Sequence, residues 1–181
     1  MTGVQTCALP ISLAARRIIP EADRVVISGF NETPLLQYFG GFQGTGGLYW
    51  ENARGLHATI DFLAAHDDED ARRVAVERSL RGVIIWSSDE KIEQFHFCKY
   101  GHKDPESIRK TLAYRLTHGG PYPDWIGPIP FNSTPLAKGM QFTIFRILPE
   151  RAALSTPIPA TAVQPDISIG VTQGATSTPA D

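Results

Sequence analysis

The stretch RVVISGFNETPLLQYFGGFQGTGGLYWE, Arg24–Glu51, decides the fold of this chain. It begins with a β-branched run, Arg24–Ser28, which is closed by Gly29 and predicts a strand. Thr33–Phe39 has the apolar spacing of a short helix, whereas Gly40–Gly47 is too rich in glycine to form either regular element. We therefore expect any binding site of this chain to lie near the exit of the first strand.

Strands and helices alternate along the chain after this stretch. Leu48–Trp50 predicts a short second strand, and Asn52 opens a helix whose apolar residues share one face. Ala71–Leu80 predicts another helix, and Gly82–Trp86 is the most hydrophobic run, typical of a buried strand parallel to the first. Helical crossovers between parallel strands predict a small three-layer α/β domain, in which helices flank a short, mainly parallel sheet.

The pattern is less regular beyond the central strand. Lys91–Tyr100 fits a helix or a strand, while Pro105–Thr117 predicts one amphipathic helix. Pro121–Pro135 is a proline-rich connection without an element of its own, and Gln141–Leu148 is the last predicted strand. Residues 150–181 are rich in Thr, Ser, Ala and Pro, which predicts a flexible tail after the α/β domain of residues 12–149.

Composition places the chain among ordinary soluble globular proteins. Its 181 residues, 42% of them hydrophobic, suit one domain with a real core. The net charge of −2 comes from nearly equal numbers of acids and bases, so it provides no argument for nucleic acid as a partner. No apolar run reaches the roughly 18 residues that would span a bilayer. We expect no cofactor in this chain and no nucleic-acid partner.

The first residues, Met1–Ile11, have neither helical nor strand periodicity. Their sequence, MTGVQTCALPI, can be back-translated into a common short-read sequencing adapter with GTG as the start codon. We interpret the segment as an artefact of cloning or assembly and exclude it from the fold. The consequence is that the natural protein is expected to extend upstream of Ser12, and this chain would be a C-terminal fragment. A natural N-terminus without regular structure is the alternative.

Two groups of residues carry metal-binding side chains in an unsuitable setting. His96, Cys98 and His102 lack a fourth ligand and the spacing of the common zinc motifs, so a polar helix face with a half-buried cysteine is the preferred interpretation. Cys98 and His96 point to different sides of a regular element, which argues against a nucleophile and base. Asp68–Asp70 has the form of an acidic metal-binding triplet, but it starts a predicted helix, where capping explains acids. We predict neither a metal site nor a catalytic residue.

The glycine-rich link and the aromatic residues after it also have two interpretations. Gly40–Gly47 has the composition of a phosphate-binding loop, yet it leads into a predicted strand, so close approach of another segment explains it better. Tyr49 and Trp50 end that strand beside the polar residues Glu51 and Asn52. Their rings either belong to the core or face a pocket in which they would stack on a sugar.

The order of these segments resembles a known family. A helix that ends in Ile-Pro is followed by RVVIS, a variable loop, QYFGG, a glycine-rich link, LYWEN and FLAAHDDEDARRVAVERSLRGVIIW. YGHKDPESIRKTLAYRLTHGGPYPDWIGPIPF and a last strand ending in FRILP complete the series. Over Ser12–Pro149 the chain resembles the soluble domain that follows the transmembrane helices of GT-C class glycosyltransferases, especially oligosaccharyltransferase catalytic subunits and their uncharacterised bacterial relatives.

The resemblance implies a division of labour within a larger membrane protein. In that family the first strand delivers a WWDYG motif that helps to select the acceptor peptide, and the catalytic acids lie in the transmembrane half. The corresponding position, Ser28–Glu32, reads SGFNE and lacks both tryptophans, the tyrosine and the glycine of the motif at their expected places. The resemblance therefore implies an extracytoplasmic, periplasmic domain whose partner is the missing transmembrane region, but not peptide N-glycosylation.

Loops that leave the carboxyl ends of parallel strands form the crevice of an open α/β sheet. The residues predicted to bind an acceptor or a lipid-linked sugar lie in two such loops: Gly29, Asn31, Glu32, Trp50, Glu51 and Asn52. Two alternatives to this prediction remain open. In the first, the domain is a stand-alone α/β module that binds a ligand or a nucleotide. In the second, it is a purely structural lid.

Overall fold

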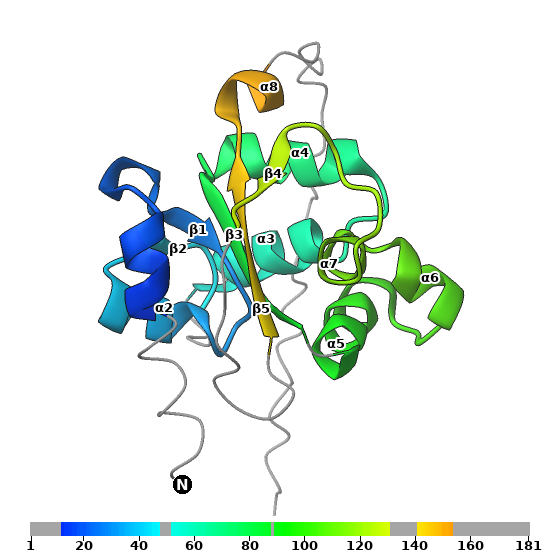
Figure 1. Ribbon diagram of the computed structural model, residues 1–181. Coiled ribbons are helices and arrows are strands. Elements are labelled where there is room, and N and C mark those ends of the chain that lie inside the picture. Colours follow the sequence, from blue (N-terminus) through cyan, green and yellow to red (C-terminus); the bar gives the residue numbers. More distant parts are fainter. Residues whose placement is uncertain (1–11, 48–51, 88, 131–140, 154–181) are drawn as a thin grey trace, which may run out of the picture.

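A five-stranded sheet forms the centre of the molecule (Figure 1). The computed structural model describes residues 12–47, 52–87, 89–130 and 141–153. The strands follow the spatial order β2-β1-β3-β5-β4, and their bounds are Val25–Ile27 (β1), Gln43–Gly44 (β2), Gly82–Ser87 (β3), Ile126–Pro128 (β4) and Gln141–Ile147 (β5). β1 is parallel to β2 and to β3, whereas β5 is antiparallel to β3 and to β4. Among the strands described, β5 thus runs against the other four.

Helices cover both faces of this sheet (Figure 1). A helix at residues 12–18 and α2 lie on one face, and α3, α4, α5 and α7 lie on the other. The bounds are Thr33–Gly40 (α2), Ala53–Leu63 (α3), Asp68–Glu77 (α4), Asp89–Tyr100 (α5), Pro105–Lys110 (α6), Leu112–Thr117 (α7) and Pro149–Ala153 (α8), with a 3-10 turn, η1, at Glu21–Asp23. The predicted α/β class, with helices flanking a sheet, is confirmed.

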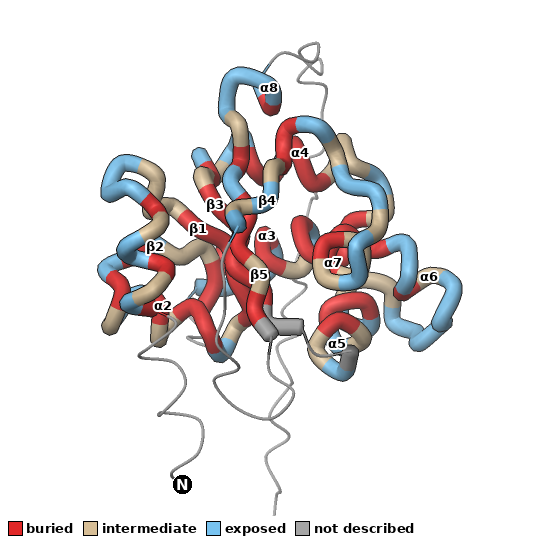
Figure 2. Tube along the Cα trace, viewed as in Figure 1, coloured by how far each residue is buried: buried red, intermediate tan, exposed pale blue. Residues whose placement is uncertain are grey.

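Side chains of β1 and β3 alternate between two hydrophobic clusters, as the period of a strand requires. Val26 and Ile84 pack with the helix at residues 12–18 and with α2. Ile27, Val83 and Ile85 pack with the larger group of helices on the other face. Figure 2 shows the buried residues concentrated in the sheet and on the inner sides of the helices. The central strand is therefore buried on both faces, as its sequence predicts.

The predicted helix at Pro105–Thr117 is wrong in one respect, because it is broken at Thr111 into α6 and α7. Thr111 has an extended backbone, and its hydroxyl accepts a hydrogen bond from Tyr114 N at 3.3 Å, which caps α7. Leu112 N donates to Ala65 O at 2.8 Å, so the break fixes this segment to the α3–α4 connection. A cap and a tertiary contact override the helical pattern at this point.

Two connections that were predicted to lack regular elements each contain a short strand. Gly40–Gly47 contains β2 at the sheet edge, where a Cβ on Gly44 would overlap Thr33 Cγ2. Pro121–Pro135 contains β4 at the opposite edge, where a proline is tolerated. Lys91–Tyr100 is helical within α5, and β5 confirms the last predicted strand. The strand predicted at Leu48–Trp50 lies outside the described residues.

The structure tests the predicted C-terminal end of the domain only in part. α8 continues four residues past Pro149, where the tail was predicted to begin, and Ala152 is buried against the larger cluster. The segments assigned to an adapter, residues 1–11, and to the rest of the tail, residues 154–181, lie outside the described residues.

Candidate functional site

The carboxyl ends of β1, β2 and β3 meet at one edge of the sheet, because these three strands run in parallel. The chain leaves β1 into a turn at Ser28–Thr33, leaves β2 at Thr45, and leaves β3 into α5, which carries Lys91 in its first turn. We call this region the carboxyl-end rim and define it by the residues Ser28, Gly29, Asn31, Glu32, Thr45, Asn52 and Lys91.

Backbone and side-chain hydrogen bonds close the turn after β1. Glu32 N and Thr33 N both donate to Gly29 O, at 3.2 Å and 3.0 Å, and Thr33 Oγ1 donates to the same oxygen at 2.9 Å. A Cβ on Gly29 would overlap Glu32 Oε2. The Glu32 carboxylate therefore folds back over the turn and lies directly against Gly29.

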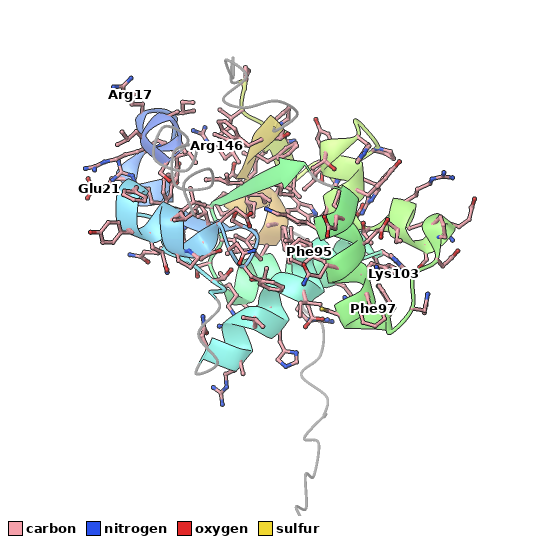
Figure 3. The ribbon with its side chains drawn as sticks, turned by 90° about the horizontal axis from the view of Figure 1, so that it is seen from below. Arg17, Glu21, Phe95, Phe97, Lys103 and Arg146 are labelled. Atoms are coloured by element: carbon pink, nitrogen blue, oxygen red, sulfur yellow. The ribbon has the colours of Figure 1, made fainter. Side chains whose placement is uncertain are left out.

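Glu32 is buried and forms an ion pair with Lys91 of α5. Its side chain is 8% exposed, while that of Lys91 is 34% exposed. Beside the pair, the rings of Phe30 and Phe95 meet edge to face with centroids 5.1 Å apart. Phe95 points into the core from α5, whereas Phe97 lies on the outer side of that helix (Figure 3). A charged contact and an aromatic contact thus fix the turn to α5.

Asn31 lies between these two anchors and is exposed. Its side chain makes no hydrogen bond to any residue that the structure describes. Ser28, at the strand exit, is 1% exposed, and its hydroxyl likewise has no hydrogen-bond partner within the described ranges. Buried polar atoms normally have a partner, so this hydroxyl is an unused donor and acceptor at the rim.

Asn52 caps α3 and ties it to the exit of β2. Gly55 N donates to Asn52 Oδ1 at 3.1 Å, and Asn52 Nδ2 donates to Thr45 O at 3.2 Å. A Cβ on Gly55 would overlap Thr45 O, so the start of α3 and the link after β2 are in close contact. A Cβ on Gly46 of the glycine-rich link would likewise overlap Thr59 Oγ1 of α3, so the link allows the close approach of another segment that its sequence predicts.

Buried contacts of Thr33 connect the two predicted loops. Its methyl group lies against Gly44 of β2, and the next residue, Thr45, accepts the hydrogen bond from Asn52. Gly29, Asn31, Glu32 and Asn52 thus lie around the same edge. Trp50 and Glu51, together with Tyr49, lie outside the described residues. Lys91 was not among the predicted residues. Its position shortly after the most hydrophobic strand could have indicated that it lies at the same strand exits.

The acidic triplet at the start of α4 pairs with arginines. Asp67, the preceding residue, caps the helix by accepting from Glu69 N at 2.9 Å. Each acid of the triplet then pairs with one arginine: Asp68 with Arg115, Glu69 with Arg72 and Asp70 with Arg73. The triplet thus starts a helix, as predicted, but the cap is Asp67, and the three carboxylates are used in ion pairs. No group of metal-binding residues occurs in the described part of the chain.

His96 and Cys98 of α5 do not form the predicted polar helix face with a half-buried cysteine. His96 is fully buried, and Cys98 is exposed on the other side of the helix. His96 Nδ1 lies 3.0 Å from His102 O, and its Nε2 lies 2.7 Å from Ser107 Oγ. The separation of His96 from Cys98 agrees with the argument against a thiol nucleophile with a histidine base.

Comparison with solved structures finds a fold likeness. The chain is similar to the C-terminal globular domain of an oligosaccharyltransferase from Archaeoglobus fulgidus, with a TM-score of 0.60 and 15% sequence identity, over 81% of this chain and 99% of that domain. No family model matches the sequence. No curated protein matches it either. Within the described residues, no helix is long and apolar enough to cross a membrane. The likeness concerns the fold alone: this chain shares the α/β fold of that domain.

Proposed function

We propose that this chain is the extracytoplasmic domain of a membrane glycosyltransferase-like protein and that the carboxyl-end rim contacts an acceptor or a lipid-linked sugar. The observation that carries the proposal is the shared fold, which extends over 99% of the archaeal domain at a TM-score of 0.60. In this proposal the catalytic centre and any metal belong to the membrane half of the protein, and the domain itself holds no cofactor.

Two features of the rim support a contact role. Asn31 is exposed between two anchors that hold its turn, so it is presented to solvent in a defined position. Its amide offers both a donor and an acceptor, which suits a peptide backbone or a sugar hydroxyl. A pre-organised site loses little conformational entropy on binding.

The structural lid remains a second candidate because two predicted side chains are used internally. Glu32 is paired with Lys91, and Asn52 caps α3 and bonds to Thr45. Under the proposal, Gly29, Glu32 and Asn52 shape the rim, while Asn31 touches the ligand, together with Trp50 and Glu51. Under the lid alternative, none of them touches a ligand.

Titration of the ¹⁵N-labelled chain, followed by NMR, separates these candidates. The probes are a short peptide containing Asn-x-Thr, a water-soluble sugar diphosphate and ATP, each added alone. Localised shifts at Asn31 and its neighbours with the peptide or the sugar diphosphate, lost in Asn31→Ala but kept in the exposed control Gln94→Ala, support the proposal. Shifts with ATP alone favour a nucleotide-binding module, and no localised shift with any probe favours the lid.

A genomic observation tests the membrane part of the proposal independently. The gene in the source genome, read upstream of the Ser12 codon, should encode a series of long apolar spans. A separate soluble domain or a start codon at that place would contradict the membrane assignment, whatever the titration shows.

A further inference from the structure

A cluster of aromatic and polar side chains joins the α3–α4 connection to α5 and α6. We call it the imidazole cluster and define it by His66, His96, Tyr100, His102 and Ser107. The ring of His66 stacks on Tyr100 with centroids 4.4 Å apart and on His96 with centroids 5.7 Å apart. Tyr100 OH donates to Ala64 O at 3.1 Å. These contacts join the α3–α4 connection to α5, which is distant from it in the sequence.

Ser107 links the two stacked imidazoles by hydrogen bonds. Its Oγ lies 2.7 Å from His96 Nε2 and 3.4 Å from His66 Nε2. The other nitrogen of His96, Nδ1, lies 3.0 Å from His102 O, a carbonyl oxygen that can only accept. His96 Nδ1 must therefore carry a hydrogen, and the neutral ring has its lone pair on Nε2.

This tautomer fixes the direction of the whole chain of hydrogen bonds. With His96 neutral, the Ser107 hydroxyl donates to His96 Nε2, so its oxygen accepts from His66 Nε2–H. The neutral His66 ring then keeps its lone pair on Nδ1, so an added proton can enter the cluster at His66 without breaking a hydrogen bond of this chain.

A charge on His66 is disfavoured in the closed cluster. The charged ring would stack against Tyr100 and His96, with centroids 4.4 Å and 5.7 Å away, and it is only partly exposed to water. Burial disfavours the charged form of a basic group.

We propose that the imidazole cluster is a pH-sensitive latch, which holds α6 and the end of α5 against the α3–α4 connection at neutral pH and releases them in mild acid. The released part is small and close to the surface. α6 has six residues, of which Ile108 is the buried one. Besides the cluster, a backbone bond from Leu112 N to Ala65 O anchors its far end.

Burial and the neighbouring basic groups disfavour a charge on His66. Burial, and after it the neighbouring His96, lowers the pKa of His66 below its usual 6.5, and Lys99 of α5 and Lys110 of α6 add to this effect against a backbone hydrogen bond at Ser107. On the other side, Asp61 of α3 and Asp70 of α4 face Tyr100. Lys99 is in turn 3.6 Å from Asp61.

The lowered pKa gives the sign of the pH dependence. At a pH between the pKa of His66 in the latched state and its usual pKa of 6.5, the open state binds more protons than the latched state. Opening therefore becomes easier as the pH falls below 6.5. One proton linked to opening changes the opening constant by up to about tenfold per pH unit. The latch is therefore closed above this range and weakened within it.

Amide hydrogen exchange of the ¹⁵N-labelled chain at pH 7.5, 6.5 and 5.5 tests the latch. The protection factors of α6 amides should fall by about tenfold across this range in the wild type, relative to amides of β3 in the same molecule. His66→Gln should remove the pH dependence, whereas His57→Gln, at an exposed histidine of α3, should leave it unchanged. Protection that does not depend on pH in the wild type, or that keeps its dependence in His66→Gln, would overturn the proposal.

Two further measurements keep the proposal testable if a histidine variant fails to fold. The ring nitrogen shifts of His96 at pH 7.5 should report a hydrogen on Nδ1, and an Nε2–H tautomer contradicts the latch. Ser107→Ala keeps both imidazoles but interrupts the chain, so it should lower α6 protection at pH 7.5 and flatten its pH dependence. Wild-type behaviour of Ser107→Ala would equally refute the role of the chain.

Discussion

Lys91→Met tests most directly whether the turn after β1 is held by its ion pair. Methionine keeps most of the apolar stem of lysine but removes the ammonium group, so the Glu32 carboxylate stays buried, with 8% of its side chain exposed and without that counter-charge. Removing one partner of a fully buried pair costs roughly 3–5 kcal/mol. Because the Lys91 side chain is 34% exposed, water offsets part of the loss, and we expect about 2 kcal/mol.

The assay is thermal and urea unfolding followed by circular dichroism. In a domain of this size, 1 kcal/mol shifts the melting temperature by about 2–4 °C, so Lys91→Met should melt about 4–8 °C lower. Lys103→Met is the matched control, because Lys103 pairs with Glu93 at 3.7 Å with both side chains well exposed. Such surface pairs contribute about 0–1 kcal/mol, so the control should shift the melting temperature by at most a few degrees.

A double-mutant cycle separates the ion pair from the other contacts of Lys91. Glu32→Gln combined with Lys91→Met removes both charges, so no carboxylate is left buried, and the double variant should be more stable than Lys91→Met alone. The coupling free energy should be at least about 1 kcal/mol. Additive effects, or a melting temperature of Lys91→Met equal to that of the Lys103→Met control, would refute the reasoning.

The other predictions concern the glycine at the start of α3, the exposed rim residue, a helix cap and pH. Gly55→Ala should destabilise by about 1–3 kcal/mol in urea unfolding, because the new methyl group overlaps Thr45 O, whereas Gly127→Ala, which meets no atom within 4 Å, should change stability little. Asn31→Ala should leave the free energy of unfolding within about 0.5 kcal/mol of the wild type, since the side chain is exposed, and a larger loss would contradict its assignment to a ligand contact. Thr111→Ala should cost about 1 kcal/mol by loss of the α7 cap, and an unchanged urea midpoint would show that the cap contributes nothing. Stability should decrease as the pH falls below 6.5, by at most about 1.4 kcal/mol per pH unit for the one proton of His66, and His66→Gln should reduce this slope in pH-dependent urea titrations.

The central layers of the fold could be predicted because local signals and tertiary structure agree there. β-branched runs form β1 and β3, and regularly spaced apolar residues form α3 and α4. In each of these elements the apolar residues are buried, as the pattern requires. The short edge strands were missed for the opposite reason. β2 and β4 form by pairing with neighbours distant in sequence, and glycine or proline in their own sequence conceals them.

The sequence indicated which residues lie at the strand exits but not the contacts that their side chains make. The rule that parallel strands end at one edge correctly brought Gly29, Asn31, Glu32 and Asn52 together. It did not indicate that Glu32 is paired with Lys91 or that Asn52 caps a helix, since both depend on tertiary contacts. The burial of His96 was missed because the partners that satisfy its ring, His102 O and Ser107 Oγ, come from beyond the end of its own helix.

The internal use of Glu32 changes what a binding experiment at the rim should measure. A side chain that holds the turn affects affinity by altering the position of Asn31, so its removal should reduce stability and binding together. The substitution Asn31→Ala, in contrast, should reduce binding without reducing stability. The comparison of Asn31→Ala with Lys91→Met therefore distinguishes a contact residue from a positioning residue at the same turn. If both variants bind all probes as the wild type does, the turn is a rigid part of a lid, and the buried ion pair serves stability alone.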